Sequence, residues 1–294
     1  MQYNLFLEKD FFNTEQIDAL KKNGDCVFCL PNDLSSLNSL DEKIIAYDPD
    51  YAGWEFNKKI LSAKNIKAIC LATSTESYID KQVCDSRNIK VLSIPGYSTD
   101  SVAEYMAFLM FCLARKLPLQ MQKDFKQDFS PGLTQMQLRG KKVGIIGLGN
   151  IGSRFAEIAH GIGMEICYWN RTAKKVKYQY CELKDIFSEC DVILVALPSN
   201  SETQKIITDD LLVSMTSNTI LLSVGGDKLL NHELVVQMAE QKKIFGYGLE
   251  IPNKSPVDYK GNVMVTSEFG WFTKESQDAR VAGLFKNLIS AKSK

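Results

Sequence analysis

The chain has 294 residues, which is enough for a large buried core and for two domains rather than one. Its 35 lysines and arginines are balanced by 35 aspartates and glutamates, so the formal net charge at pH 7 is zero. This balance excludes an overall field that would recruit nucleic acid or an anionic membrane. We therefore expect small molecules or other proteins as partners, with no nucleic acid and no membrane.

Three further features predict a reduced, cytoplasmic protein. The longest apolar run, residues 106–114, is far shorter than the roughly 20 residues that cross a bilayer. The first residues lack the basic start and apolar stretch of a signal peptide. The eight cysteines lie mostly in apolar runs, as reduced thiols do. Cys26 and Cys29 form the one CxxC pair, and without a second pair they predict no metal site.

The first third of the chain alternates short apolar runs with helical stretches, which is typical of a parallel sheet covered by helices. Asn13, followed three residues later by Gln16, resembles a capping box at the start of a helix. A long amphipathic helix over residues 101–116 follows and is expected to connect the two domains. The predicted strands are residues 3–7, 25–30, 44–47, 68–72 and 89–94, and the first predicted helix is 14–22.

A second α/β series begins near residue 141, and its strand order predicts a doubly wound Rossmann domain. A last helix, residues 274–291, has apolar residues at helical spacing and is expected to return to the first domain. The fold class is therefore α/β with two doubly wound parallel-sheet domains. Six strands are predicted in this second series: residues 143–146, 165–169, 192–196, 219–223, 244–248 and 263–266.

A glycine-rich turn is the most informative motif of the chain. It follows the apolar run 143–146 and precedes a helical stretch, and it reads Gly147-Leu148-Gly149-Asn150-Ile151-Gly152. In this strand–turn–helix context, Gly147 permits the tight turn, Gly149 lets the backbone approach a pyrophosphate, and Gly152 lets helix and strand pack closely. The free N–H groups of the helix N-terminus favour phosphate. The motif predicts a dinucleotide site.

The residues that would read the adenosine ribose indicate which dinucleotide binds. About twenty residues beyond the glycines, an acidic side chain would accept a hydrogen bond from the 2′-hydroxyl of NAD. Here the strand over residues 165–169 ends instead in Asn170-Arg171-Thr172, with Lys174 and Lys175 following. Cations without a carboxylate favour the 2′-phosphate of NADP(H), with NAD(H) as a possible second cofactor. The alternative is that these cations belong to an ordinary solvated loop.

Several motifs together give the chain a resemblance to the D-isomer-specific 2-hydroxyacid dehydrogenases, the family of phosphoglycerate dehydrogenase and the glyoxylate/hydroxypyruvate reductases. The resemblance runs from about Lys64 to Thr273. It implies a flavodoxin-like substrate domain, residues 1–98 and 273–294, and a Rossmann cofactor domain, residues 99–272. It also implies a homodimer joined largely through the cofactor domain. The motifs are Ile94-Pro95-Gly96-Tyr97, Val102-Ala103-Glu104, Leu138-Arg139-Gly140 running into the glycine turn, Ala196-Leu197-Pro198 with Thr203, Leu249-Glu250, and Asn262 to Thr266.

The resemblance also implies a set of cofactor contacts. Gly149, Asn150 and Ile151 would contact the pyrophosphate. The ribose and adenine side would be formed by Asn170, Arg171, Thr172, Lys174, Leu197, Pro198 and Thr203, and the nicotinamide side by Ser223, Val224, Gly225, Glu250 and Gly270.

The catalytic residues implied by the family are missing from this chain. Reduction of a 2-keto acid needs a cation for the carboxylate and an acid for the developing alkoxide. The family supplies an arginine, a histidine and a glutamate, whereas this chain has Gly226, Glu268 and Ser255 at those positions. The only histidines, His160 and His232, are interpreted as surface or capping residues. The expected glycine-rich substrate loop is replaced by Ser74, Thr75 and Glu76 with their neighbours, and Glu76 would repel an anion if it pointed inward.

Two hypotheses follow from this departure. The first is an NADP-dependent oxidoreductase with Glu268 as the proton donor, which requires burial to raise its pKa, and with Glu250 positioning the nicotinamide. Its substrate would not be an ordinary 2-keto acid. The part of the substrate that occupies the space left by Gly226 would be neutral or cationic. The second is a catalytically silent NADP(H)-binding protein that acts as a sensor or scaffold. The fold cannot choose between them.

Overall fold

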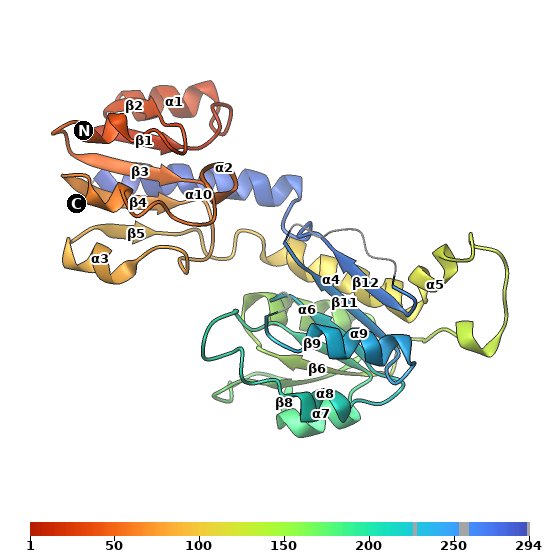
Figure 1. Ribbon diagram of the computed structural model, residues 1–294. Helices are drawn as coiled ribbons and strands as arrows, with labels where there is room; N and C mark the ends of the chain where they lie inside the picture. Colours follow the sequence, from red (N-terminus) through yellow and green to blue (C-terminus); the bar gives the residue numbers. More distant parts are fainter. Residues whose placement is uncertain (226–227, 253–258, 293–294) are drawn as a thin grey trace. The chain divides into compact units, whose positions relative to one another are not determined.

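The computed structural model describes residues 1–225, 228–252 and 259–292. The chain divides into two compact units. Unit 1 comprises Met1–Ser98 and Thr273–Lys294, and unit 2 comprises Thr99–Phe272. Figure 1 shows one parallel sheet in each unit. The protein is therefore α/β with two parallel sheets.

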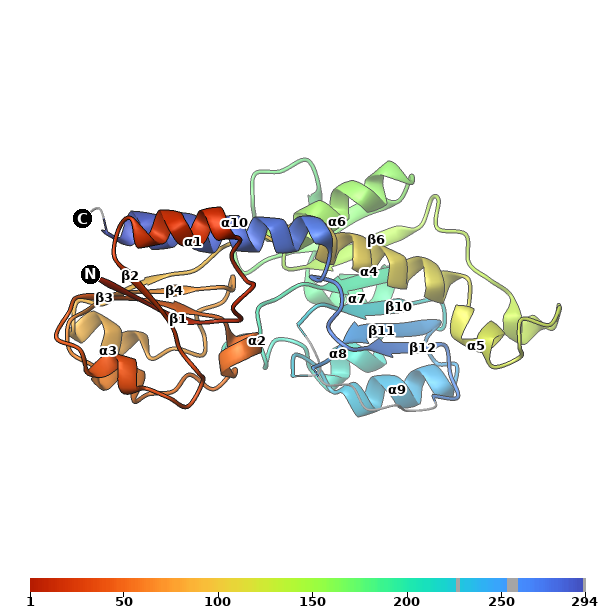
Figure 2. The ribbon, with the colours of Figure 1, turned by 90° about the horizontal axis from the view of Figure 1, so that it is seen from above.

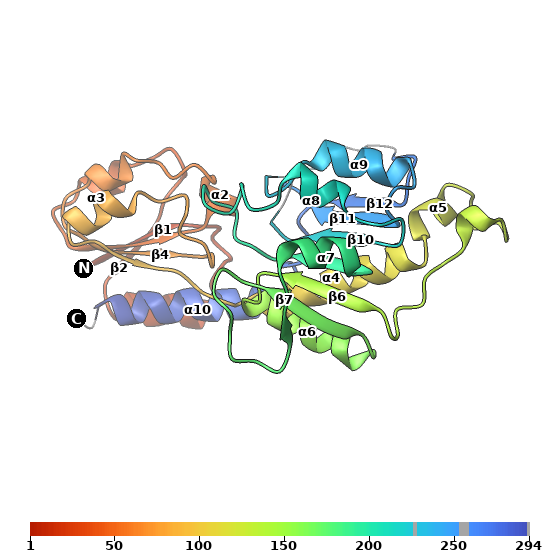
Figure 3. The ribbon, with the colours of Figure 1, turned by 90° about the horizontal axis from the view of Figure 1, so that it is seen from below.

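Unit 1 is built on a five-stranded sheet in the order β2-β1-β3-β4-β5, with all neighbours parallel. Figure 2 shows α1 and α10 side by side on one face of this sheet, and Figure 3 shows α3 on the other. The bounds are β1 Gln2–Phe6, α1 Thr14–Lys21, β2 Asp25–Phe28, β3 Lys43–Tyr47, α2 Pro49–Ala52, β4 Ile66–Leu71, α3 Lys81–Ser86, β5 Lys90–Leu92 and α10 Lys274–Lys292. Short 3₁₀ helices cover Ser35–Asn38 and Ile60–Ser62.

Unit 2 is built on a seven-stranded parallel sheet in the order β12-β11-β10-β9-β6-β7-β8. Helices α4 and α6 cover one face, and α7, α8 and α9 cover the other (Figure 3). The bounds are α4 Thr99–Ala114, α5 Leu117–Met121, β6 Lys142–Ile146, α6 Asn150–Gly161, β7 Glu165–Trp169, β8 Gln179–Tyr180, α7 Leu183–Glu189, β9 Val192–Val195, α8 Asp209–Val213, β10 Ile220–Ser223, α9 His232–Glu240, β11 Gly246–Glu250 and β12 Val263–Thr266. A 3₁₀ turn covers Pro131–Leu133.

Strand order creates a switch point in unit 2. From β6 the chain moves outward through β7 and β8, then returns to place β9 on the other side of β6. Ile146 at the end of β6 pairs with Val195 at the end of β9. In open parallel sheets, ligands bind beyond the carboxyl ends of the strands at such a point. The glycine-rich turn therefore lies where a dinucleotide site belongs.

Each predicted strand has a counterpart in the structure, with ends that lie within two residues of the predicted ones, and one strand was not predicted. The capping box of α1 is present, because Asn13 and Gln16 bond each other's backbone N–H groups. The sequence predicted six strands in the second series, whereas the described part of unit 2 contains seven. The missed strand, β8, has only two residues, Gln179 and Tyr180. Two residues are too few for an alternating pattern to show, so only the pairing with β7 reveals this strand.

Candidate active site

The glycine turn has the local geometry that the motif requires. Gly147 has φ = 100°, and a Cβ there would lie 2.7 Å from the carbonyl oxygen of Ala196. At Gly152, a Cβ would lie 2.2 Å from the carbonyl oxygen of Gly147, so only glycine lets α6 start against the strand. Gly149 differs, because a Cβ there would meet nothing within 4 Å. The space in front of Gly149 is the opening in which a pyrophosphate fits.

The start of α6 provides unsatisfied donors beside that opening. Gly149 is the N-cap residue, and it has no side chain to bond the first N–H groups of the helix. The first turn contains no acidic residue, and Asn150 and Ile151 begin the helix. Free N–H groups together with the positive end of a helix dipole attract phosphate. A dinucleotide therefore fits these residues by both shape and charge.

The residues after β7 hold the glycine turn and carry positive charge. The side-chain oxygen of Asn170 accepts a 2.7 Å hydrogen bond from the N–H of Leu148. The ammonium group of Lys174 donates to the carbonyl oxygen of Leu148. Arg171 is 70% exposed and forms a 2.8 Å ion pair with Glu202, which is 68% exposed. Such an exposed pair is weak, so a competing anion can displace Glu202 from the guanidinium.

The loop after β9 is held by hydrogen bonds among its own residues. The hydroxyl of the buried Thr203 donates to the carbonyl oxygen of Pro198 and accepts a 3.0 Å hydrogen bond from the N–H of Asn200. A Cβ on Gly225 would lie 2.9 Å from the carbonyl oxygen of Leu197, so this glycine permits close packing of two cofactor-edge loops. The predicted contacts in this region therefore include residues that shape the loop itself.

Ser223 and Val224 end and follow β10 at this same edge. Ser223 is buried, and the N–H of Val224 donates to the carbonyl oxygen of Val195 over 2.9 Å. The predicted substrate residue Gly226 and the departure at Ser255 lie outside the described residues. The structure describes the predicted nicotinamide-side residues up to Gly225 and again at Glu250 and Gly270.

A buried carboxyl group ends β11. Glu250 is 6% exposed, and its Oε1 accepts hydrogen bonds of 2.7 Å from the N–H groups of Phe269 and Gly270. Burial first, and then the negative charge of Glu268, raise the pKa of Glu250 to about 6, against the lowering effect of the two N–H groups. Glu250 therefore holds the segment that carries Glu268 by two hydrogen bonds. It also lies close enough to Glu268 for the charge of one carboxyl group to affect the other.

Glu268 itself is an exposed residue of unit 2. The hypothesis required that Glu268 be buried, and the structure does not bury it; the buried carboxyl group beside this segment is that of Glu250. Glu250 ends β11 and Glu268 follows the neighbouring strand β12, and burial of Glu250 together with the charge of Glu268 favours retention of one proton.

Tyr105 also belongs to this site, although no sequence pattern pointed to it. Its hydroxyl donates a 3.1 Å hydrogen bond to the hydroxyl of Thr266. A Cβ on Gly270 would lie 3.1 Å from the Tyr105 side chain and 2.7 Å from Oε2 of Glu250. Burial first, and then the charge of Glu250, raises the pKa of Tyr105. Tyr105 lies in α4, more than 140 residues before β11, and a single tyrosine in a buried helix carries no local signal.

The predicted substrate loop lies at the carboxyl edge of the unit 1 sheet, and its charges are compensated. Glu76 accepts a 2.6 Å contact from the ammonium of Lys81 and a 2.8 Å hydrogen bond from the hydroxyl of Ser93. These partners hold the pKa of Glu76 below its usual range. Ser74 is exposed, and the Thr75 hydroxyl donates to Ser77 over 3.0 Å. Glu76 is therefore an ion-paired loop residue.

An arginine that the sequence analysis did not select lies near this edge. Arg280 of α10 is 5% exposed and forms ion pairs with Asp48 and, over 3.0 Å, with Asp50. Its Nε donates a 2.8 Å hydrogen bond to the carbonyl oxygen of Ala72. Burial raises the pKa of Asp48 to about 6, although the guanidinium opposes this shift. Because two carboxylates share Arg280, it is not available to anchor a substrate carboxylate.

Neither histidine is placed as a catalytic acid. His160 is exposed in the last turn of α6. His232 begins α9, and its Nδ1 lies 3.3 Å from the hydroxyl of the buried Tyr247. His160 agrees with its interpretation as a surface residue, whereas His232 is partly buried against Tyr247 and the cap of α9 is Asn231, so the interpretation of His232 as a surface or capping residue was wrong. The described residues contain no group of three His, Cys, Asp or Glu side chains arranged to hold a metal ion. They also contain no helix with the length and apolar character of a membrane span.

Comparisons with known proteins identify the family. The model for the NAD binding domain of D-isomer specific 2-hydroxyacid dehydrogenases matches residues 107–268. This match covers more than half of the chain, and the chain belongs to that family. It therefore carries the NAD(P)-binding domain of these oxidoreductases.

Individual relatives are distant. A 2-hydroxyacid dehydrogenase homolog of Zymomonas mobilis is 28% identical over 200 residues, which cover 66% of this chain and 60% of that protein. A glyoxylate reductase from Paecilomyes thermophila superimposes with a TM-score of 0.85 at 22% identity, covering 100% of this chain and 96% of its own. An acyclic imino acid reductase in complex with NADPH and D-Arg gives a TM-score of 0.82 at 24% identity, covering 99% and 96%. At these identities, the two superpositions establish the shared fold.

Proposed function

We propose that this protein is an NADPH-dependent reductase whose proton source is the carboxyl pair of Glu250 and Glu268. Its substrate is a carbonyl or imine compound that is neutral or cationic near the reacting carbon, and not an ordinary 2-keto acid. One observation carries the proposal: a buried carboxyl group with a pKa of about 6 ends a strand at the same sheet edge as the glycine turn. Three strand spacings separate β11 from β6, about 14 Å.

The cofactor would be held by the residues around the glycine turn. Asn150 and Ile151 offer backbone N–H groups to the pyrophosphate, and Gly149 leaves the space for it. Arg171 would bind the 2′-phosphate in place of its weak pair with Glu202, because a phosphate dianion is the stronger acceptor. When bound, NADPH supplies the hydride.

The carboxyl pair would supply the proton. Burial of Glu250 first, and then repulsion by Glu268, keep the pair protonated to a higher pH than an isolated carboxyl group. The N–H groups of Phe269 and Gly270 hold Glu250 in place, so the segment that bears Glu268 is fixed relative to β11. Glu268, as the exposed member, would donate to the substrate.

The charges present also favour the proposed substrate class. A 2-keto carboxylate approaching Glu250 and Glu268 would be repelled, and the family's arginine is absent at Gly226. A neutral imine would instead take its proton from the carboxyl pair, and the carboxylate left behind would attract the iminium that accepts the hydride. The solved imino acid reductase, which is described with NADPH and D-Arg, shares this fold and makes imines a reasonable class to test.

The function is tested by NADPH oxidation with a panel of imines, aldehydes, ketones and 2-keto acids. We expect turnover with an imine or a neutral carbonyl compound, and little with 2-keto acids. Glu268→Gln should abolish turnover while leaving NADPH affinity unchanged, because the amide cannot donate the proton as an acid does. Glu275→Gln, in the first turn of α10, is the matched control. Full activity in Glu268→Gln would overturn the assignment.

Cofactor preference is tested separately by binding. NADPH should bind more tightly than NADH, and Arg171→Ala should remove most of the difference. Lys177→Ala deletes an exposed cation in the same loop and should leave the preference intact. Equal affinities of the unaltered protein for the two cofactors would contradict the proposal.

A catalytically silent, NADP(H)-binding sensor or scaffold is the second candidate. The observation in its favour is that Arg280 is neutralised by Asp48 and Asp50, while neither histidine is placed as an acid. Tight NADPH binding without oxidation by any member of the panel would select this function.

We also propose a homodimer formed through unit 2. Phe108 and Phe111 are 47% and 42% exposed and lie three residues apart on α4, so they share one face of the helix. Apolar side chains gathered on one helix face favour burial by a second copy. Phe111→Asp should convert the dimer to a monomer in light scattering, and a monomeric parent would refute the dimer.

A further inference from the structure

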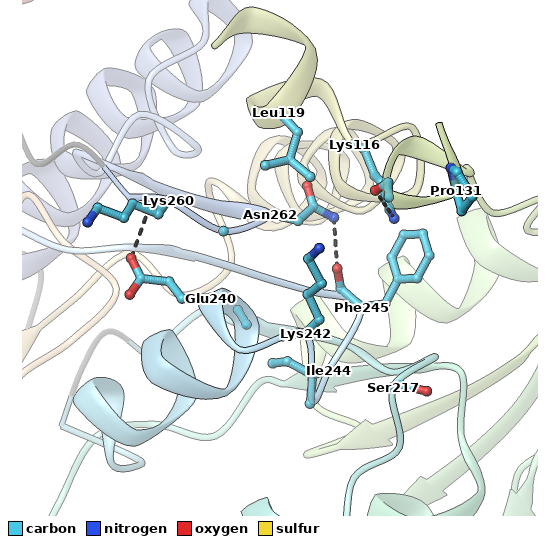
Figure 4. Close-up of a pocket in the computed structure, with 13 residues that line it drawn as sticks. Lys116, Leu119, Pro131, Ser217, Glu240, Lys242, Ile244, Phe245, Lys260 and Asn262 are labelled. Atoms are coloured by element: carbon cyan, nitrogen blue, oxygen red, sulfur yellow. Dashed lines mark hydrogen bonds between the residues drawn. The ribbon is translucent and has the colours of Figure 1, made fainter. Parts of the chain in front are cut away.

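A pocket lies in unit 2 at the edge of the sheet opposite to the glycine turn. Its wall includes Ser217, Phe245 and Asn262, which precede β10, β11 and β12 respectively. Because all strands are parallel, residues that precede strands lie at the amino edge, whereas the glycine turn follows β6 at the carboxyl edge. The cavity has a volume of about 180 Å³ (Figure 4). It is therefore separate from the proposed cofactor site.

Two lysines bring positive charge to this cavity. The ammonium of Lys116 donates a 2.9 Å hydrogen bond to the carbonyl oxygen of Gly132 and lies 4.7 Å from the centre of the Phe245 ring. The ammonium of Lys242 also approaches Gly132, at 3.9 Å from the position that a Cβ would take. Burial, and then the charge of Lys242, lower the pKa of Lys116. The two cations therefore repel each other across the cavity.

No carboxylate of the described chain forms an ion pair with either lysine. Glu240 also lines the cavity, but its carboxylate accepts a 3.0 Å hydrogen bond from the backbone N–H of Lys260. In Figure 4, the ammonium of Lys260 points away from Lys242. The positive charge of Lys116 and Lys242 is thus left without an internal counter-ion in the part of the chain that the structure describes.

The wall also contains an unused hydrogen-bond acceptor. Asn262 is 4% exposed, and its Nδ2 donates hydrogen bonds of 2.9 Å to the carbonyl oxygens of Leu113 and Phe245. Its Oδ1 is buried and has no partner among the described residues. Exchanging the two amide atoms would place oxygen against two carbonyl oxygens, so the orientation is fixed. A buried acceptor without a partner is costly and favours a ligand or water that can donate.

We propose that this cavity binds a small phosphate-bearing anion, with Lys116 and Lys242 as its cationic donors. Lysine ammonium groups are common phosphate ligands. A protonated phosphate oxygen, or a hydroxyl of the ligand, supplies the donor that Asn262 lacks. A second hollow of about 560 Å³ shares Lys116 and Phe245 with the first and is lined by Arg139, which leaves room for the remainder of a phosphomonoester.

The test measures phosphate binding by calorimetry on the whole protein saturated with NADPH, so that the cofactor's own phosphate contacts are already occupied. Inorganic phosphate and glycerol 3-phosphate are titrated separately. We expect one saturable site, weakened about tenfold or more by Lys242→Gln and by Lys116→Gln, because each removes a charge-assisted hydrogen bond. Tighter binding of glycerol 3-phosphate identifies a phosphomonoester site, and equal binding identifies a site for free phosphate.

Lys243→Gln is the matched control, because it removes the same charge from the neighbouring residue, which does not line the cavity. Its phosphate affinity should equal that of the parent. The contrary role is that Lys116 and Lys242 only neutralise the carbonyl ends of α4 and α9. No saturable binding up to concentrations on the order of 10 mM, or equal weakening by all three substitutions, would establish that role and overturn the proposal.

Discussion

The carboxyl edges of the two sheets differ in how their charged side chains are paired. In unit 1, Arg280 is shared by Asp48 and Asp50, and Glu76 is paired with Lys81. In unit 2, Glu250 is buried, has no ion pair with any residue that the structure describes, and is bonded by two backbone N–H groups. Burial raises the pKa of both Asp48 and Glu250 to about 6, but Asp48 is held by a guanidinium, whereas Glu250 has no ion pair among the described residues and is the carboxyl group available for proton transfer. We therefore expect proton transfer to depend on the carboxyl group of unit 2, and the ion pairs of unit 1 to contribute to the stability of the fold.

The comparison predicts its largest effect at Arg280. Arg280→Met leaves Asp48 buried without its cation, and removal of one partner of a buried ion pair costs about 3–5 kcal/mol. Urea unfolding followed by circular dichroism measures this loss. Adding Asp48→Asn in the same chain should recover part of it, because the buried negative charge is then gone.

The control for this prediction is Lys274→Met. Lys274 pairs with Asp278 in the same helix, but its side chain is 82% exposed, so the loss should stay below about 1 kcal/mol. Equal losses in the two variants would show that the buried pair in unit 1 has no special role.

A smaller effect is expected at Gly149, and on binding rather than on stability. A Cβ there meets no described residue within 4 Å, so Gly149→Ala should unfold like the parent. The methyl group would occupy the space in front of the helix N-terminus and weaken NADPH binding about a hundredfold, or about 2.7 kcal/mol.

Gly161→Ala provides the matched comparison for Gly149. It also places a Cβ in open space, at the other end of α6. NADPH affinity, measured by quenching of protein fluorescence, should be unchanged in this variant. If Gly149→Ala bound NADPH as tightly as Gly161→Ala, the glycine turn would not be the pyrophosphate site.

The smallest effect concerns the pH dependence of stability at Glu250. Its pKa is about 6 in the folded protein against 4.5 for the free group, so the folded state binds the proton more tightly. The corresponding stability is fully present below pH 4.5 and is lost as the pH rises through 6, by an amount on the order of 2 kcal/mol. Glu250→Gln should remove this loss between pH 5 and pH 8.

The same substitution has a readout in activity. Reduction by the parent should slow as the pH rises through 6, because the proton of the carboxyl pair is lost. In Glu250→Gln this fall should move to lower pH, because Glu268 no longer has a charged neighbour. A fall that stays near pH 6 in the variant would exclude Glu250 from the proton source.

Local patterns were sufficient for most of the fold. The capping box of α1, the buried strands and the glycine turn depend on residues close together in the chain, so periodicity and turn chemistry predict them. The glycine positions are informative because a Cβ at Gly147 or Gly152 would collide with backbone oxygen atoms. Strand β8 was missed because two residues carry no period.

The sequence by itself determined that the chain has a dinucleotide cradle and lacks the arginine and histidine that its family places on a keto acid. Only the tertiary structure decided which of the remaining charged side chains are buried and which are paired. Arg280 meets Asp48 across 232 positions of the chain, and Glu250 receives its hydrogen bonds from residues 19 and 20 positions away. Burial and pairing depend on which distant segments the fold brings together, and no local pattern of residues contains that information.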